Sequence, residues 1–232
     1  MSEFTIDPRL LEMAQMMASD EPLHPDLVPY YDPDRVHGMG MLRHPLVYSV
    51  PFSSNAMVNK QYESKKSAVA RALEEKNFDR YVFLHERPYR VDAFKEIQDE
   101  LSDWKYWKIL GEIWVDTENQ HANIRAWKNL LNSKRPHRHY FMGEDETNLL
   151  LSLPDEVTIY RGCLKGRNEN GLSWTLDKVK AEWFAKRLLR SGTPLLLTGV
   201  VKKSDIVAVL LGRNESEIVT MKVANITKVV LR

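Results

Sequence analysis

The feature that most constrains this fold is a change of hydrophobic period at Pro154. Before it, apolar residues recur at spacings of three and four, as in 104–115, a stretch with three tryptophans that predicts a central, largely buried helix. After it, β-branched and apolar runs are separated by turn residues, at 157–160, 195–201, 206–211, 218–223 and 226–231. Helices followed by strands predict an α+β fold with a mainly antiparallel C-terminal half.

Residues 1–60 have the pattern of an N-terminal arm. A short amphipathic helix is expected from Pro8 to Ser19, after which prolines recur every few residues from Pro22 to Pro51 and should interrupt regular structure. The segment keeps enough apolar side chains, Phe52 among them, that we expect it to pack over the rest of the chain.

Residues 61–232 are expected to form one domain, mainly helical over 61–152 and mainly β over 153–232. Within it, 117–120 fits a capping box that opens a helix. A second helix is expected over 177–190, with four apolar residues on the side that faces the sheet: Val179, Trp183, Phe184 and Leu188.

Composition excludes several classes of protein. The 232 residues are 43% hydrophobic, which is too apolar for a disordered chain, and no apolar run is long enough to span a bilayer. The first twenty residues lack the pattern of a secretory signal. The single cysteine, Cys163, rules out an intramolecular disulfide and a cysteine-cluster zinc site, and we expect it to be buried and unreactive. A reducing cytoplasm is the expected compartment, although an injected or exported protein would have the same composition.

The net charge of +1 conceals an asymmetry. Residues 1–60 carry four basic and eight acidic side chains, whereas residues 176–232 carry eleven basic and five acidic ones. A basic C-terminal part can face a polyanion or a phosphate-bearing ligand, but an unevenly mixed surface explains the numbers equally well. The turn 134–138 and the neighbouring His139 suggest a phosphate or RNA contact. No acidic residue or cysteine stands at ligand spacing from the two histidines of this stretch, so a solvated turn is favoured over a metal site.

Three short motifs in the C-terminal half carry the candidate chemistry. Tyr160-Arg161-Gly162 ends a strand, where an arginine can present a bidentate fork to a phosphate. In Ser173-Trp174-Thr175 the two hydroxyl residues share one face of an extended segment, although Thr175 could simply cap the next helix. In Glu215-Ser216-Glu217 two carboxylates share one strand face, which suits acid–base or cation-stabilising work. Surface ion pairs, packing and solvated faces are the alternatives for each.

In this order the three motifs resemble the arginine–serine–glutamate class of mono-ADP-ribosyltransferases, which includes bacterial toxins and bacteriophage enzymes. That pattern is an aromatic-Arg-Gly strand end, a Ser-x-Ser or Ser-x-Thr strand and a Glu-x-Glu or Gln-x-Glu loop. The resemblance covers roughly residues 100–232 and departs from many members only at Thr175, where the hydroxyl is kept. It implies a split antiparallel β-sandwich preceded by a helical region.

The resemblance also implies roles for residues. Arg161 and Gly162 would bind NAD⁺ at its phosphates and its nicotinamide amide, and Ser173 would orient the ribose and the catalytic Glu217. Glu217 would stabilise the developing ribosyl cation, and Glu215 would position the nucleophile, which in members with glutamate there tends to be an arginine. Thr175, Tyr160 and Phe184 complete the expected NAD⁺ site, although packing is the alternative for Tyr160 and a core position is favoured for Phe184. No metal is required.

The expected function is therefore transfer of ADP-ribose from NAD⁺ to arginine side chains of host proteins by a phage or bacterial effector. An RNA or DNA base as acceptor, water as acceptor, and a non-catalytic interaction module remain alternatives. From charge alone, the acidic arm is a candidate cover for the basic cleft, or a docking site for an antitoxin or chaperone. No membrane partner is expected.

Overall fold

The computed structural model describes residues 7–36, 39–49, 54–117, 120–187, 192–212 and 215–231. The chain divides into two compact units, Met1–Asp99 and Glu100–Arg232. The arm expected to end at residue 60 therefore belongs to the same unit as residues 61–99.

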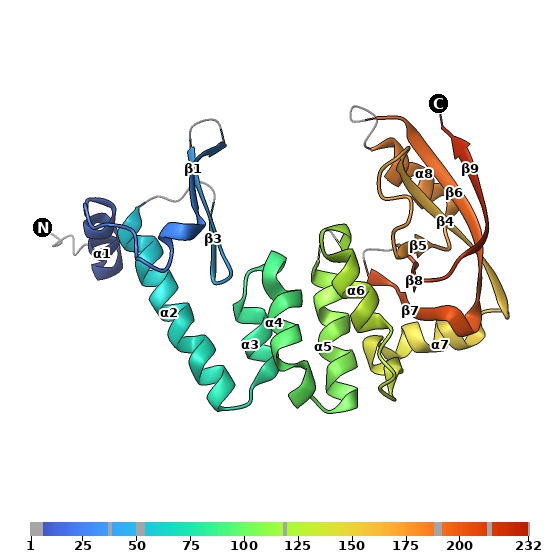
Figure 1. The fold of residues 1–232 in the computed structure, drawn as a ribbon, viewed down its shortest axis with the longest axis horizontal. Coiled ribbons are helices and arrows are strands. Elements are labelled where there is room, and N and C mark those ends of the chain that lie inside the picture. The colour runs from blue at the N-terminus through green and yellow to red at the C-terminus, as the bar shows by residue number, and fades with distance from the viewer. Residues whose placement is uncertain are drawn as a thin grey trace, which may run out of the picture. The chain divides into compact units, whose positions relative to one another are not determined.

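The first unit combines four helices with a small sheet among its described residues (Figure 1). Its helices are α1 (Pro8–Met17), α2 (Asn55–Glu74), α3 (Phe78–Leu84) and α4 (Arg90–Ile97). Its three antiparallel strands, in the order β1-β2-β3, are β1 (Tyr31–Val36), β2 (Met39–His44) and β3 (Val47–Ser49).

The prediction that prolines would exclude regular structure from this segment is wrong, because each proline in the sheet occupies a tolerant position. Pro33 lies in β1, an edge strand whose register shifts between Asp32 and Val36. A proline is tolerated at such a position, because its missing N–H does not interrupt the hydrogen bonds of a central strand. Pro45 occupies the turn between β2 and β3. Phe52 lies outside the described residues.

The first unit has its own apolar core. Leu27, Leu42 and Val47 are fully buried against Val58 and Tyr62 of α2. The expected helix near the N-terminus is confirmed as α1, capped by Asp7, but none of its described side chains is buried. The described part of the N-terminal segment thus packs on α2 within the first unit.

The second unit begins with three helices, α5 (Asp103–Asp116), α6 (Ile124–Leu131) and α7 (Glu144–Ser152). The expectation of a central buried helix is confirmed for α5, in which Trp107 and Trp114 are inaccessible to solvent. Its terminal residues Trp104 and Val115 are exposed, because a helix end projects beyond the neighbours that cover its middle. The expected capping box includes residues 118 and 119, which lie outside the described part of the chain.

Six strands then form one open antiparallel sheet in the order β7-β8-β5-β4-β6-β9 (Figure 1). They are β4 (Glu156–Leu164), β5 (Ser173–Thr175), β6 (Pro194–Lys202), β7 (Ile206–Leu210), β8 (Glu217–Thr220) and β9 (Ala224–Val230). The α+β class is confirmed. β4 pairs with β6 along nine positions, but β4 pairs with β5 only at Tyr160 and Thr175.

Helix α8 (Lys178–Lys186) lies on β4. The prediction of which side of this helix faces the sheet is wrong, because Val179 and Trp183 are exposed while Ala181 and Ala185 are fully buried. The cause is Gly162, because a Cβ placed there would lie 1.8 Å from the carbonyl oxygen of Ala181. Small residues on both surfaces allow backbone-to-backbone packing, which larger side chains would prevent. Leu188 is not among the described residues.

Among the described residues, no helix is both long enough and apolar enough to cross a membrane.

Candidate functional site

A cleft of about 480 Å³ lies in the second unit, and all three predicted motifs contribute to its walls. β4 supplies Tyr160-Arg161-Gly162, and β5 supplies Ser173-Trp174-Thr175. Glu215 and Glu217 come from the start of β8 and the residues before it. Residues separated by more than fifty positions in the sequence therefore meet in one concavity, where strand pairing between β4 and β5 ends.

Arg161 is held in the cleft wall by backbone acceptors. Its Nε donates to the carbonyl oxygen of Asn168 at 3.2 Å, and its Nη1 donates to the carbonyl oxygen of Ser173. Burial lowers the pKa of the guanidinium, which nevertheless stays protonated at neutral pH. Because both partners are neutral, the bonds orient the side chain without cancelling its charge. Over the described residues, its other three N–H groups form no hydrogen bond.

The absence of a side chain at Gly171 leaves room for the Arg161 guanidinium. A Cβ there would lie 2.1 Å from Nη2 and 2.3 Å from Cζ of Arg161. The sequence alone predicted no role for Gly171.

Glu217 combines desolvation with two hydrogen bonds. The indole Nε1 of Trp114 donates to its Oε1 at 3.2 Å, and the Ser173 side chain forms a further hydrogen bond with it. Burial is the largest effect on its pKa and raises it, and the charge of Glu215 raises it further. The bonds from Ser173 and Trp114 and the charge of Arg161 act in the opposite direction without overcoming burial. Glu217 is thus a desolvated carboxyl group that holds its proton more tightly than an exposed glutamate does.

The predicted alignment of Glu215 and Glu217 on one strand face is wrong in its geometry. β8 begins at Glu217, and Ser216 has a φ of 44°, so strand alternation does not extend back to Glu215. Both carboxylates still line the cleft. The turn at Ser216, and not the alternation of side chains along a strand, places the two carboxylates in the cleft wall.

Thr175 organises that turn. Its buried hydroxyl donates to the carbonyl oxygen of Glu215 at 2.6 Å and accepts from the backbone N–H of Asp177 at 3.0 Å. The alternative in which Thr175 caps α8 is wrong, because Asp177 is the N-cap and accepts from Val179 and Lys180. Thr175 therefore connects the start of α8, through Asp177, to the backbone of Glu215.

The remaining predicted residues also line the cleft. Tyr160 is partly exposed there and pairs through its backbone with Thr175. Phe184 is half-buried in the cleft wall and not in the core, which corrects the position favoured from the sequence. Cys163 is buried as expected, and burial raises the pKa of its thiol, which disfavours the reactive thiolate.

The cleft is also lined by residues that were not singled out as site residues from the sequence, among them Trp114, His121, Asn168 and Arg187. Trp114 was expected to be a core residue, and its ring is buried. The sequence did not predict that its indole N–H donates to Glu217. The Arg187 guanidinium lies 4.5 Å from the Phe184 ring centroid. The two residues are three positions apart on a helix, and this spacing could have indicated the contact from the sequence. Asn168 has a φ of 55°, and its buried Oδ1 has no hydrogen-bond partner within the described chain.

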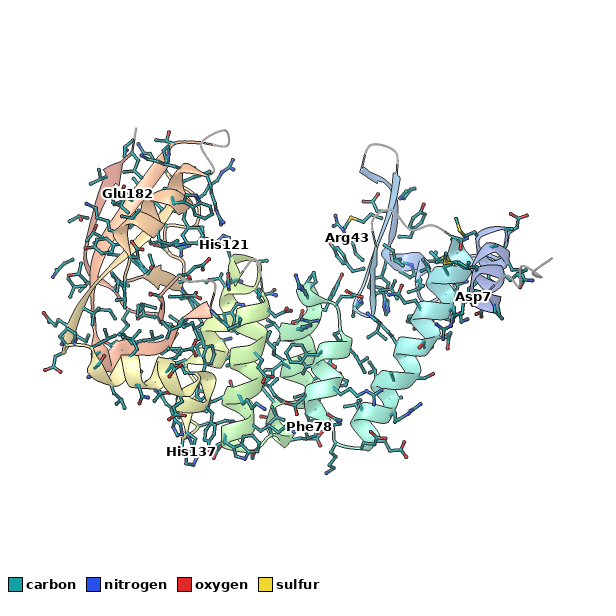
Figure 2. All side chains as sticks on the ribbon, turned by 180° about the vertical axis from the view of Figure 1, so that it is seen from behind. Asp7, Arg43, Phe78, His121, His137 and Glu182 are labelled. Atoms are coloured by element: carbon teal, nitrogen blue, oxygen red, sulfur yellow. The ribbon has the colours of Figure 1, made fainter. Side chains whose placement is uncertain are left out.

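The histidine-rich turn is not part of this cleft. His137 and His139 are exposed at η5 (Arg138–Phe141), with ring centroids 5.9 Å apart. Figure 2 shows His137 at the opposite end of the α5 and α6 helices from His121, which lines the cleft. Over the described ranges no group of three or more His, Cys, Asp or Glu side chains is arranged to hold a metal ion.

Comparisons of the chain with family models, with curated proteins and with solved structures find no match.

Proposed function

We propose that the second unit is an NAD⁺-dependent mono-ADP-ribosyltransferase. The observation that carries the proposal is the convergence of Arg161, Ser173 and Glu217, from three motifs far apart in sequence, on one cleft. Their contacts match a division of labour between an anion-binding cation, an orienting hydroxyl and an acidic group.

The finer fold belongs to the same proposal. The resemblance implies a split antiparallel β-sandwich. The single pairing of β4 with β5 supports such a split, since the cleft lies where their ladder stops. The helices α5 to α7 would be the helical region that precedes the motifs.

Arg161 would bind the phosphates of NAD⁺ through its remaining N–H groups, since guanidinium forks suit phosphate oxygens. Tyr160, Gly162, Thr175 and Phe184 would complete the binding site. Close packing against α8 already explains why position 162 is a glycine, so a contact with nicotinamide would come from its backbone.

Ionised Glu217 would accept a hydrogen bond from the ribose 2′-hydroxyl and stabilise positive charge on the ribose as its bond to nicotinamide breaks. The electron pair of that bond leaves with nicotinamide, and the acceptor forms a new bond to the same ribose carbon. Glu215 would take the proton that the acceptor nitrogen loses. Because NAD⁺ carries a cationic ring, its binding beside Glu217 would favour the ionised carboxylate.

Glutamate at position 215 supports an arginine side chain of a protein as the acceptor. On this proposal the protein is a phage or bacterial effector that acts in a bacterial or host cytoplasm. Nucleic acid and water are acceptors that the same residues would also serve, and the test below separates them.

The test uses labelled NAD⁺, a bacterial lysate and the wild-type chain beside Glu217→Gln. We expect nicotinamide release and macromolecular label from the wild type, label lost on protease digestion, and a rate about 10²–10³-fold lower for the variant. Label lost with nuclease would move the acceptor to nucleic acid. Nicotinamide release without label would indicate hydrolysis. Absence of both nicotinamide release and NAD⁺ binding would refute the enzyme assignment and leave an interaction module.

A further inference from the structure

The outer face of α8 is unusual for a helix that packs on a sheet. Ala181 and Ala185 face β4, so the opposite side of the helix should be polar. It carries instead Val179, 75% exposed, and Trp183, 56% exposed, among Lys180, Lys186 and Arg187. We call these five residues the α8 face.

The α8 face is continuous with the cleft through Arg187. This residue lines the cleft, and its guanidinium lies 4.5 Å from the ring centroid of Phe184 and 5.3 Å from that of Trp183. A macromolecule whose reacting group enters the cleft would therefore meet Trp183 at the rim.

The chemistry of the α8 face selects its partner. Its five residues include three cations, and the neighbouring Glu182 forms an ion pair with Lys178 at 4.0 Å, so a segment complementary to the face is acidic. Exposed tryptophan and arginine are the side chains that most often dominate protein–protein binding, and an exposed valine adds aliphatic area. Lys180 and Arg187 already lie within 6 Å of the Trp183 ring centroid, so a stacking base would have to displace a cation.

We propose that the α8 face is the docking surface for the protein acceptor, and that it binds an acidic, partly apolar segment next to the arginine that is modified. This inference rests on the proposed function, because it identifies which proteins that site would modify. An acidic segment would also offset repulsion between the basic surface and an incoming guanidinium.

Binding is measured first, because it does not depend on catalysis. Fluorescence anisotropy with the full chain compares a short labelled peptide, with one arginine among Asp, Glu and Leu, with a peptide in which Lys replaces the acidic residues. A labelled single-stranded oligonucleotide is the third probe. We expect the acidic peptide to bind at least about tenfold more tightly than the lysine peptide.

Trp183→Ala should weaken binding of the acidic peptide by about tenfold or more, and Lys180→Glu should weaken it while favouring the lysine peptide. Trp104→Ala is the matched control, since Trp104 is 45% exposed at the far end of α5 and lies near Tyr140. It should leave binding unchanged.

Transfer is then compared on the acidic peptide and on a free guanidino compound. Trp183→Ala should lower kcat/KM for the peptide only, with nicotinamide release in the absence of acceptor unchanged. Equal binding of the two peptides, or full binding by Trp183→Ala, would overturn the proposal. Oligonucleotide binding that Trp183→Ala abolishes would overturn it in favour of nucleic acid. Peptide binding without any nicotinamide release would instead count against the enzyme.

Discussion

At the scale of single residues, the site joins groups that are costly to keep in the folded state. Glu217 is desolvated beside a second carboxylate, and its compensation comes from Trp114 and Ser173. Arg161 is held by backbone carbonyls, and among the described residues it forms no hydrogen bond to a carboxylate. Strongly perturbed groups in a cleft are typical of functional sites, because stability alone would replace them with apolar residues.

The raised pKa of Glu217 has a consequence for stability that does not involve catalysis. The folded chain binds this proton more tightly than the unfolded chain, in which the ordinary glutamate value is 4.5. The contribution of Glu217 to stability therefore falls as pH rises from about 4.5 through the folded value. Glu217→Gln removes that loss and keeps an oxygen for the Trp114 N–H.

We expect the Tm of Glu217→Gln to exceed that of the wild type at about pH 8, by about 2–4 °C for each kcal/mol removed, and to equal it at about pH 4. Thermal unfolding followed by circular dichroism measures both. Glu156→Gln is the matched control, since Glu156 is exposed at the start of β4 and is not among the residues that line the cleft. A variant less stable than the wild type at the higher pH would show that burial does not penalise the carboxylate.

At the scale of elements, the contact of α8 with β4 depends on one missing side chain. In Gly162→Ala the new Cβ would meet the backbone of Ala181 and Ala185, at 1.8 Å and 2.6 Å, and neither can rotate away. We expect a loss of about 1–3 kcal/mol, measured by denaturant unfolding. Gly212→Ala is the control, because a Cβ there has no atom within 4 Å. Equal stability of the two variants would mean that α8 can shift without cost.

The same contact shows what sequence patterns can predict. Helical and strand periods gave the α+β class, the buried middle of α5 and the order of strands along the chain, because burial enforces those periods. The inner face of α8 was predicted wrongly, because hydrophobicity favours Trp183 over Ala181, and only the position of Gly162 opposite the helix reverses that choice. The Glu215–Glu217 turn and the β1–β2–β3 sheet were missed for a similar reason. The left-handed conformation of Ser216 and the edge position of β1, which tolerates Pro33, depend on tertiary contacts. Local sequence patterns do not reveal those contacts.

At the scale of the molecule, charge is divided between the two units. The first unit, residues 1–99, carries 12 basic and 16 acidic side chains, for a net charge of −4. The second, residues 100–232, carries 21 basic and 16 acidic side chains, for a net charge of +5. The unit that holds the cleft is therefore the one whose overall field attracts phosphates.

This division predicts how salt acts on the proposed reaction. Raising ionic strength from about 0.1 M to about 1 M shortens the screening length from about 10 Å to about 3 Å, which removes the field of distant charges. The KM for NAD⁺ should rise several-fold, whereas the KM for nicotinamide riboside, which lacks phosphates, should change little. Direct contacts from Arg161 are screened less, because this side chain lies partly inside the protein, so binding of NAD⁺ should weaken without being abolished. Nicotinamide release with each substrate measures both constants. Equal salt dependence for the two substrates would mean that the net charge of the second unit does not act on the nucleotide, and that Arg161 and its immediate neighbours alone determine its affinity.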